Sequence, residues 1–310
     1  MEKFVVSREF DGMRLDRFMR HAIPGLPQSI IQKWIRKSAL LVNQKKCKAN
    51  DRVLEGQTIT SPSFQMNEVY IPKKTTTVSP HILKDFKSWV MYEDADLMII
   101  NKPAGLAVQG GTGLKIHLDL IFKTLEEQEG LTLKLVHRLD KETSGLMVLA
   151  KNRAAAETLT SQFYRREITK NYMALVVGQP FEISGIIDLP LSKGMTPTGE
   201  RVITDTENAR EAVTSYTVLQ TLDELSLLKL QPETGRTHQL RAHCQYGLGT
   251  PILGDGKYGG KGALPFGREE NLFLHAYQLI IPTVSGKNIE VVAKLPHHFL
   301  HFVKDLSVDY

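Results

Sequence analysis

The sequence is poor in cysteine: Cys47 and Cys244 are the two thiols among 310 residues, and neither has CxxC or Cys/His spacing around it. A disulfide scaffold and a structural zinc site are therefore disfavoured, and we expect two ordinary thiols. No apolar run approaches the roughly 18 residues that a membrane span needs. The N-terminal residues MEKFVVSREF lack both the apolar stretch of a signal peptide and an Arg-rich transit pattern. We expect a cytoplasmic protein without a membrane partner.

The fingerprints of cofactor-binding loops are also missing. Neither a GxxxxGK phosphate loop nor a dinucleotide-binding glycine motif occurs. The spacing of His238 and His243 could indicate a metal site, but no third ligand accompanies them. The sequence therefore predicts an activity that needs neither a metal nor a small-molecule cofactor.

Positive charge is present, but it is concentrated in the first fifth of the chain. Residues 1–62 hold twelve Lys or Arg against six Asp or Glu, whereas the remaining residues hold 27 against 28. This asymmetry indicates a small module that meets a polyanion, attached to a nearly neutral body.

The basic segment predicts two helices and two short strands. Apolar residues recur at helical spacing in RLDRFMRHAI (14–23) and QSIIQKWIRK (28–37), and strands are expected at 40–42 and 58–60 around the Lys-rich turn NQKKCK. Solvated basic faces would explain either helix alone. Cations on both helices and on the turn together favour a nucleic-acid-binding module. The residues expected to bind point away from the apolar faces of the helices: Arg17, Lys33, Arg36 and Lys37.

Three segments follow from this pattern: a nucleic-acid-binding domain over 1–62, a linker over 63–88 rich in Pro, Thr, Lys and Ser, and a body over 89–310. A helix is expected in the body at about 153–166. Strands are expected at 97–101, 133–136, 146–150, 172–177, 214–219 and 226–231. Because no βαβ spacing repeats, we expect an α+β fold with a mixed, largely antiparallel sheet.

Two polar clusters in the body carry the chemistry. In HRLDKETSGLMVLAK (137–151), reactive side chains crowd between two apolar strands, and Gly145 lies where the chain returns to the core. A structural turn would explain Gly145 and the Thr-Ser pair, but not Arg138 beside Asp140. The second cluster, ETGRTHQLRAH (233–243), follows a strand and precedes the Gly-rich loop GTPILGDGKYG. A guanidinium there suits a carboxylate or a phosphate.

These motifs, together with KNYMALVVG (170–178), resemble the RluA family of pseudouridine synthases in content and order over about 89–300. The N-terminal segment resembles the small RNA-binding module named after ribosomal protein S-four, which precedes the catalytic domain in the branch acting on large-subunit ribosomal RNA. The chain departs from that module's usual glycines at Ser38-Ala39 and Asn43-Gln44. The resemblance implies a catalytic domain over 89–310 with a central RNA-binding cleft, large-subunit ribosomal RNA as partner, and no cofactor. Nothing indicates an obligate oligomer, so we expect a monomer.

The resemblance also implies roles for single residues. Asp140 matches the nucleophile that attacks the uridine, Arg241 the arginine that pairs with it, and Tyr172 the aromatic residue that stacks on the flipped ring. A nucleophilic carboxylate must be ionised, which requires a nearby cation. Arg138 resembles the arginine that fills the space left by the base. Tyr172 also fits a plain core position, and for Leu230 a core position is as good an interpretation as a pocket wall. The further substrate-binding candidates are Lys102, His137, Leu230, Thr234, Arg236, His238 and Gln239.

Flipping has a physical reason, because a stacked base hides its glycosidic bond; unstacking costs on the order of a few kcal/mol. Two other functions stay open at this point. An RNA-binding protein without catalysis would use the loop to grip phosphates, but such a loop has no use for Asp140. A glycosidase would need a second carboxylate at a suitable separation, and Glu142 is the close candidate.

Overall fold

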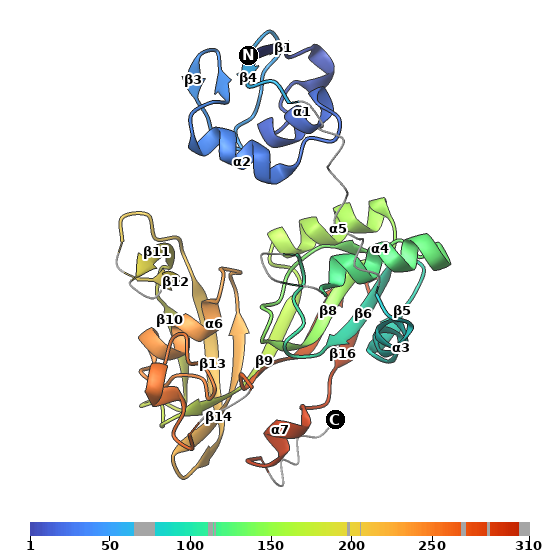
Figure 1. Cartoon of the computed structure of the whole chain (residues 1–310). Helices are drawn as coiled ribbons and strands as arrows, with labels where there is room; N and C mark the ends of the chain where they lie inside the picture. The colour runs from blue at the N-terminus through green and yellow to red at the C-terminus, as the bar shows by residue number, and fades with distance from the viewer. Residues whose placement is uncertain are drawn as a thin grey trace. The chain divides into compact units, whose positions relative to one another are not determined.

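The computed structural model describes residues 1–64, 78–110, 114, 116–196, 199–204, 206–267, 271–283 and 286–303. The chain divides into two compact units, Met1–Thr75 and Thr76–Tyr310, called here the N-terminal and C-terminal units (Figure 1). Among the described residues, no helix combines the length and the apolar character that crossing a membrane demands.

The N-terminal unit packs two helices against a small antiparallel sheet with strand order β1-β4-β2-β3. The expected helices are confirmed, because their apolar stripes form the core of the unit: Leu15, Phe18 and Met19 from the first and Ile31 and Trp34 from the second are buried. The elements are β1 (Glu2–Val5), the 3-10 turn η1 (Arg8–Phe10), α1 (Leu15–Ala22), α2 (Gln28–Arg36), β2 (Leu41–Val42), β3 (Lys45–Lys46) and β4 (Thr58–Ser61).

The positions where this unit departs from the usual glycines keep a left-handed backbone. Ser38 has φ 50°, and Asn43 and Gln44, which form the turn between β2 and β3, have φ 45° and 62°. Such angles suit glycine and, less well, asparagine. Asn43 adds support, because its side-chain oxygen accepts a hydrogen bond from the Thr58 amide at 2.8 Å. The turn is therefore retained without its glycine.

The C-terminal unit is built on one ten-stranded sheet with the order β10-β13-β14-β9-β15-β8-β6-β5, in which β16 pairs with β15 and β7 with β8. All pairings are antiparallel except that of β8 with β15. This confirms the expected α+β class with its mixed, mostly antiparallel sheet. The strands are β5 (Val90–Glu93), β6 (Leu97–Lys102), β7 (Lys134–Leu135), β8 (Ser144–Ala150), β9 (Thr169–Val177), β10 (Ser184–Asp188), β13 (Val213–Leu222), β14 (Leu225–Pro232), β15 (Leu274–Pro282) and β16 (Asn288–Val292), with a separate hairpin of β11 (Ser192–Thr196) and β12 (Gly199–Ile203).

Helices bury both faces of the part of the sheet that holds β6 and β8 (Figure 1). Met98, Ile100, Met147 and Leu149 pack with α3 (Pro80–Ser88) and α4 (Leu118–Glu129). The alternate residues of the same strands pack with α5 (Arg153–Tyr164) on the other face. Two buried faces require continuous apolar sequence, which explains why LMII and LMVLA do not alternate.

The second half of the sheet, with β9, β13 and β14, packs with α6 (Gln239–Ala242) and the C-terminal α7 (His297–Leu300). Gly145 lies near the junction of the halves, at the start of β8. It has φ 108°, and a Cβ atom there would overlap the backbone of Ala276 on β15. The expectation of a glycine-specific position is confirmed: only glycine allows the two parallel strands to approach here.

Part of the segment expected to be a linker over 63–88 is helical instead. Residues 80–88 form α3, which Ser79 caps and in which Leu83 and Phe86 are buried in the C-terminal unit. The apolar residues of HILKDFKS have helical spacing that the abundance of Ser, Thr and Lys upstream obscured. Residues 65–77 lie outside the described residues.

Candidate active site

Asp140 lies in the polar loop between β7 and β8, where the sequence placed the first reactive cluster. A tight turn closes the loop, because the Thr143 amide donates to the Asp140 carbonyl at 3.2 Å. The Asp140 side chain is 17% exposed. It lines a pocket of about 960 Å³, a size at the upper end of the range typical of ligand-binding pockets. The carboxylate is thus accessible to a small group and screened from bulk water.

Lys102, a substrate-binding candidate from the sequence, is not among the residues that line this pocket. Its side chain is fully buried at the end of β6, and Nζ donates to the carbonyls of Pro103, Leu106 and Lys141 at 2.9, 3.0 and 3.2 Å. Burial lowers the pKa of Lys102 to about 8, although nearby carboxylates raise it. Lys102 instead ties β6 to the loop that carries Asp140, because backbone carbonyls in a buried loop need a donor.

His137 lines the pocket, but one of its ring nitrogens is already used. Nε2 accepts a hydrogen bond from the Val148 amide at 2.8 Å, and the ring stacks on Phe163 with centroids 4.4 Å apart. Burial lowers the pKa of His137 to about 3, with a smaller contribution from Lys170. His137 is therefore a neutral, fixed wall of the pocket.

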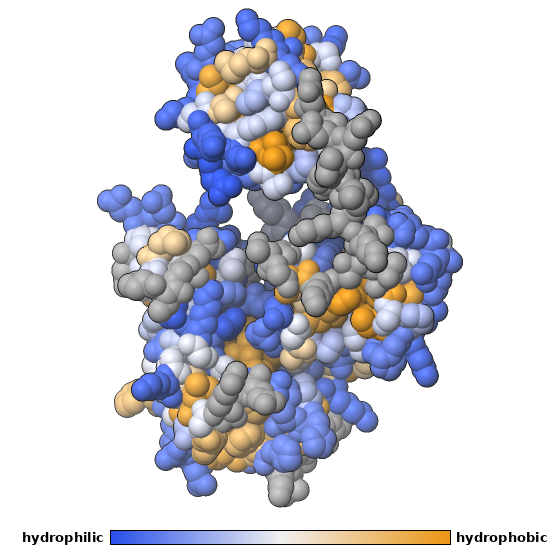
Figure 2. All heavy atoms as spheres, viewed as in Figure 1, coloured by the Kyte–Doolittle hydropathy of each residue, from blue (hydrophilic) through white to orange (hydrophobic). Residues whose placement is uncertain are grey.

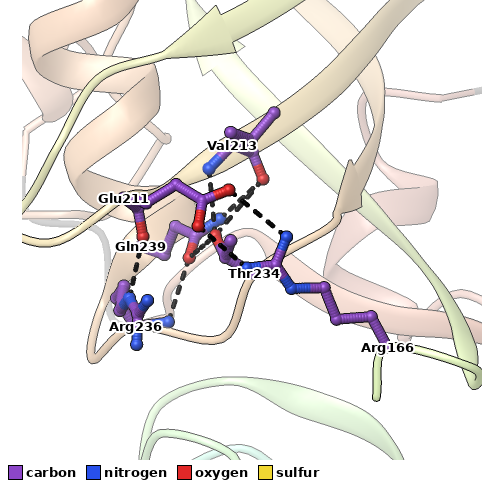
Figure 3. Close-up of polar contacts among 6 residues, drawn as sticks. All are labelled: Arg166, Glu211, Val213, Thr234, Arg236 and Gln239. Carbon is purple, nitrogen blue, oxygen red and sulfur yellow. Dashed lines mark hydrogen bonds and ion pairs between the residues drawn. The ribbon is translucent and has the colours of Figure 1, made fainter. Parts of the chain in front are cut away.

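The second cluster forms the loop between β14 and α6, and buried hydrogen bonds hold it in place (Figure 3). Gln239 Oε1 accepts from the Arg236 amide at 2.9 Å and from the Thr234 hydroxyl at 2.8 Å. Gln239 Nε2 donates to the carbonyl of Val213 at 2.9 Å. Thr234 and Gln239, two substrate-binding candidates from the sequence, line the pocket, and their polar atoms also fasten the loop to β13.

His238 is the residue through which the two clusters meet. It has a left-handed backbone, with φ 51°, immediately before α6. Non-glycine residues in this region carry strain, and such residues are frequent at functional sites. Its Nε2 lies 3.8 Å from Oδ2 of Asp140, and its Nδ1 lies 2.7 Å from the hydroxyl of Tyr258. The fold thus places an imidazole between the candidate nucleophile and a phenol.

Arg241 pairs with a different carboxylate from the one expected. Its Nε and Nη2 donate to the two oxygens of Asp255 at 2.8 and 2.7 Å, and no such bond joins it to Asp140 among the described residues. Asp255 is 1% exposed and also accepts from the amides of Lys257 and Tyr258. A bidentate partner in the adjoining buried loop outcompetes a carboxylate that faces the pocket. Burial lowers the pKa of Arg241, but the hydrogen bond with Asp255 and the charge of Asp255 outweigh this effect, so the pKa is raised overall. Asp140 lies close enough to contribute to the increase.

Tyr172 lines the pocket near the start of β9. Burial raises the pKa of Tyr172, and Asp140 raises it further, so the phenol stays neutral. Leu230 lies opposite Tyr172 in the β14–β9 pairing, but it is 0% exposed and belongs to the core. Of the two interpretations open for Leu230, the core position is the one observed.

The mouth of the pocket is predominantly basic. Arg138 is exposed there, and within the described part of the chain it has no hydrogen-bond or ion-pair partner. Arg166 forms a bidentate ion pair with Glu211 at 2.9 and 3.3 Å, and Arg236 Nε donates to the Glu211 carbonyl at 2.8 Å (Figure 3). Arg166 lowers the pKa of Glu211, which therefore stays ionised. Lys170 and Arg210 complete a rim suited to a polyanion.

The cations predicted in the N-terminal unit are all exposed, on α1 or α2 and at the end of α2: Arg17, Lys33, Arg36 and Lys37. Arg17 and Arg20 also line a small depression with Met13, His21 and Pro24. Hydrophilic residues dominate the outline of this unit in Figure 2. These side chains are exposed and can contact a polyanion.

Sequence reasoning missed several residues of the site, among them Asp255, Tyr258 and Glu211, and it did not single out the rim cations Arg166, Lys170 and Arg210. The first two belong to GTPILGDGKYG, whose glycines indicated a tight loop and drew attention away from the Asp and Tyr between them. Glu211 lies outside both clusters, and no local pattern marks it. Among the described residues, no group of three or more His, Cys, Asp or Glu side chains is arranged to hold a metal ion.

Comparisons with known proteins agree with this architecture. The profile of a family described as RNA pseudouridylate synthase matches residues 96–246, and that of the S4 domain matches residues 13–59. The chain is 38% identical over 294 residues to the ribosomal large subunit pseudouridine synthase C of Rickettsia typhi, covering 92% of this chain and 95% of the relative. The corresponding protein of Haemophilus ducreyi is 32% identical over 312 residues, covering 99% and 96%.

Solved structures point the same way. Human RNA pseudouridylate synthase domain containing 4 is 33% identical, with a TM-score of 0.59 over 71% of this chain and 94% of that one. The two sequence motifs, the pocket that they line and the likeness to relatives along nearly the whole length lead to one conclusion: the chain belongs to the RNA pseudouridylate synthase family, as an isomerase that carries an N-terminal S4 domain.

Proposed function

We propose that the chain converts specific uridines of large-subunit ribosomal RNA to pseudouridine, with Asp140 as the nucleophile. The observation that carries this proposal is the position of the Asp140 carboxylate, which lines a basic-rimmed pocket together with Tyr172 and His238. The relatives from Rickettsia typhi and Haemophilus ducreyi are named for the large ribosomal subunit, which supports the choice of RNA.

The reaction requires a group that can hold the substrate together after its glycosidic bond breaks. The bond between N1 of uracil and C1′ of ribose is broken, the base turns, and a bond between C5 and C1′ forms. C5 loses its proton and N1 gains one. Product and substrate contain the same atoms, so the balance needs neither an oxidant nor a second substrate. Asp140 can form the covalent intermediate whether it attacks the sugar or the ring. The absence of a cofactor stays a prediction.

The uridine must leave its stack before Asp140 can reach it. Tyr172 offers a neutral aromatic surface at the pocket, and Arg138 is free at its mouth. Stacking on an aromatic side chain contributes about 1–3 kcal/mol per base, which is comparable with the cost of flipping. We therefore assign Tyr172 to the flipped base and Arg138 to the gap that the base leaves.

A glycosidase mechanism fits the pocket less well. Glu142, the second carboxylate considered from the sequence, is 47% exposed, lies near Lys141 and is not among the residues that line the pocket. Glu211 does line it, but Arg166 holds it ionised, which does not suit a general acid.

The proposal is tested by incubating the purified chain with large-subunit ribosomal RNA and mapping pseudouridines by chemical labelling and primer extension. We expect conversion at a small number of positions, which are the positions lost in ribosomal RNA from cells that lack the gene. Conversion of transfer RNA alone would contradict the choice of substrate. The cytoplasmic location and the monomeric state stay predictions that accompany this one.

The N-terminal cations should govern the salt dependence of RNA binding. Replacing Arg17, Lys33, Arg36 and Lys37 by Gln should weaken binding and flatten the plot of log Kd against log salt, because each phosphate that is no longer neutralised lowers the slope by about 0.7–0.9. The single-turnover rate at saturating enzyme should not change. The control neutralises four exposed lysines of the C-terminal unit outside the pocket: Lys84, Lys123, Lys134 and Lys287. An unchanged slope with a collapsed rate would instead assign these residues to the active site.

Glu211 should weaken RNA binding, since it is an acidic side chain on a basic rim. In Glu211→Gln, Arg166 is released and a like charge is removed from the path of the phosphates, so affinity should rise a few-fold. The matched control is Glu157→Gln, which breaks an exposed Arg153–Glu157 ion pair on α5 away from the pocket. Filter binding at two salt concentrations measures both variants. Equal effects of the two changes would show that net charge, rather than the position of Glu211, matters.

A further inference from the structure

A continuous line of contacts runs from Asp140 into the buried part of the site. His238 Nε2 lies 3.8 Å from Asp140 Oδ2, and His238 Nδ1 lies 2.7 Å from the Tyr258 hydroxyl. The guanidinium of Arg241 lies 5.2 Å from the centre of the Tyr258 ring, and Asp255 holds Arg241 on the far side. The family chemistry assigned above uses the first member of this line and leaves the role of Tyr258 open.

The hydrogen bonds around Tyr258 favour one tautomer of His238. The Val202 amide donates to the Tyr258 oxygen at 3.2 Å, so this oxygen already acts as an acceptor. The phenolic hydrogen is then available for His238 Nδ1. A neutral imidazole that accepts at Nδ1 carries its hydrogen at Nε2, and Nε2 is the atom that faces Asp140.

The surroundings also keep both rings uncharged. Burial lowers the pKa of His238, as do Arg241 and Lys257, while Asp140 and Asp255 raise it. Burial raises the pKa of Tyr258 to about 12. At neutral pH, His238 is therefore a neutral donor, and Tyr258 keeps the proton with which it orients that donor.

We propose that Tyr258 is a positioning residue which, through His238, holds an N–H group toward one oxygen of Asp140. The proposal rests on the assignment of Asp140 as the nucleophile. A neutral donor on one carboxylate oxygen orients the other toward the substrate and leaves the negative charge in place. An imidazolium at the same position would neutralise that charge and reduce its reactivity. The left-handed backbone of His238 and the buried Arg241–Asp255 ion pair next to the Tyr258 ring hold the N–H donor of His238 in place.

Tyr258→Phe keeps the ring under Arg241 and removes the hydroxyl. Without the Tyr258 hydroxyl, His238 can also adopt the Nδ1–H tautomer, and its pKa beside Asp140 rises. We expect the single-turnover rate to fall on the order of 10–100-fold, as when the partner that orients a functional histidine is removed. The acid limb of the pH–rate profile should move to higher pH. The control is Tyr246→Phe, which removes a hydroxyl from the ring 6.2 Å away and should not change the rate.

Nitrogen NMR of histidine-labelled full-length protein reads the tautomer directly, and the signal that His238→Gln removes identifies His238. In the wild-type chain we expect the Nε2–H tautomer from pH 6 to 8, and in Tyr258→Phe a mixture with a raised ionisation pKa. His238→Gln retains an N–H donor that does not titrate, so it should be more active than His238→Leu and lack the acid limb. This comparison keeps the test valid even if Tyr258→Phe folds poorly, which thermal unfolding would reveal.

A wild-type rate in Tyr258→Phe, or an Nδ1–H tautomer in the wild-type chain, would overturn the proposal. Equal activities of His238→Gln and His238→Leu would overturn it as well. Failure of the underlying function has another signature: an active Asp140→Asn enzyme would remove the nucleophile assignment while NMR still found His238 as the Nε2–H tautomer.

Discussion

Asp140→Asn should abolish pseudouridine formation while the protein stays folded and still binds RNA. The amide has nearly the size and shape of the carboxylate, but it lacks the charge that makes an oxygen nucleophilic. Removal of a nucleophile lowers turnover on the order of 10⁴-fold or more. Release of tritium from uracil C5 of labelled RNA measures the rate, and filter binding measures affinity in the same samples.

The matched control is Glu142→Gln. Glu142 is a carboxylate of the same loop that is 47% exposed and lies outside the pocket lining. We expect nearly wild-type activity from this variant, so that loss of charge in the loop is separated from loss of the nucleophile. Turnover by Asp140→Asn at a rate close to that of the wild type would assign the chemistry to another group.

Arg241→Ala should cost both stability and activity. The change leaves Asp255, which is 1% exposed, without its bidentate partner. Breaking a buried ion pair by removing one partner typically costs about 3–5 kcal/mol in the free energy of unfolding. Activity should fall at least on the order of 100-fold, because Asp140 also loses a nearby buried cation. Urea unfolding followed by Trp89 fluorescence, in a Trp34→Phe background, reports on the C-terminal unit.

The double variant Arg241→Met with Asp255→Leu separates the two effects. Replacing both charges with apolar side chains removes the unpaired carboxylate, so much of the lost stability should return. Activity should not return, because the positive charge near Asp140 is still missing. A double variant that regained activity would show that Arg241 acts only as a structural residue.

The elements predicted from the sequence are those whose apolar residues have regular spacing. The helices at 14–23, 28–37 and 153–166 and the strands at 97–101, 146–150, 172–177, 214–219 and 226–231 all correspond to observed elements. The helix α4 has the same kind of signal and was missed, as was β15. The parallel pairing of β15 with β8 has no local signature, because it joins segments far apart in the chain.

In the candidate site, too, some positions could be predicted from local sequence and others depend on distant parts of the chain. The two clusters that the sequence marked do line one pocket, and Asp140, Tyr172, Arg138 and His238 all lie there. Lys102 and Leu230 do not, since a Lys or Leu beside a motif can equally point into the core. Their exposure depends on the strands that cover them, and those strands come from distant parts of the sequence.

The sequence by itself determined the family, the basic N-terminal module and the identity of the reactive side chains, because each is written in contiguous residues. Only the tertiary structure decided which side chains pair. Arg241 lies within reach of two carboxylates, and it pairs with Asp255 because a buried loop presents both oxygens of that residue to the guanidinium. Asp140 is left beside His238, whose Nε2 lies 3.8 Å from its Oδ2. Such pairing depends on how distant loops pack against each other, because charge-assisted hydrogen bonds select among partners by their geometry.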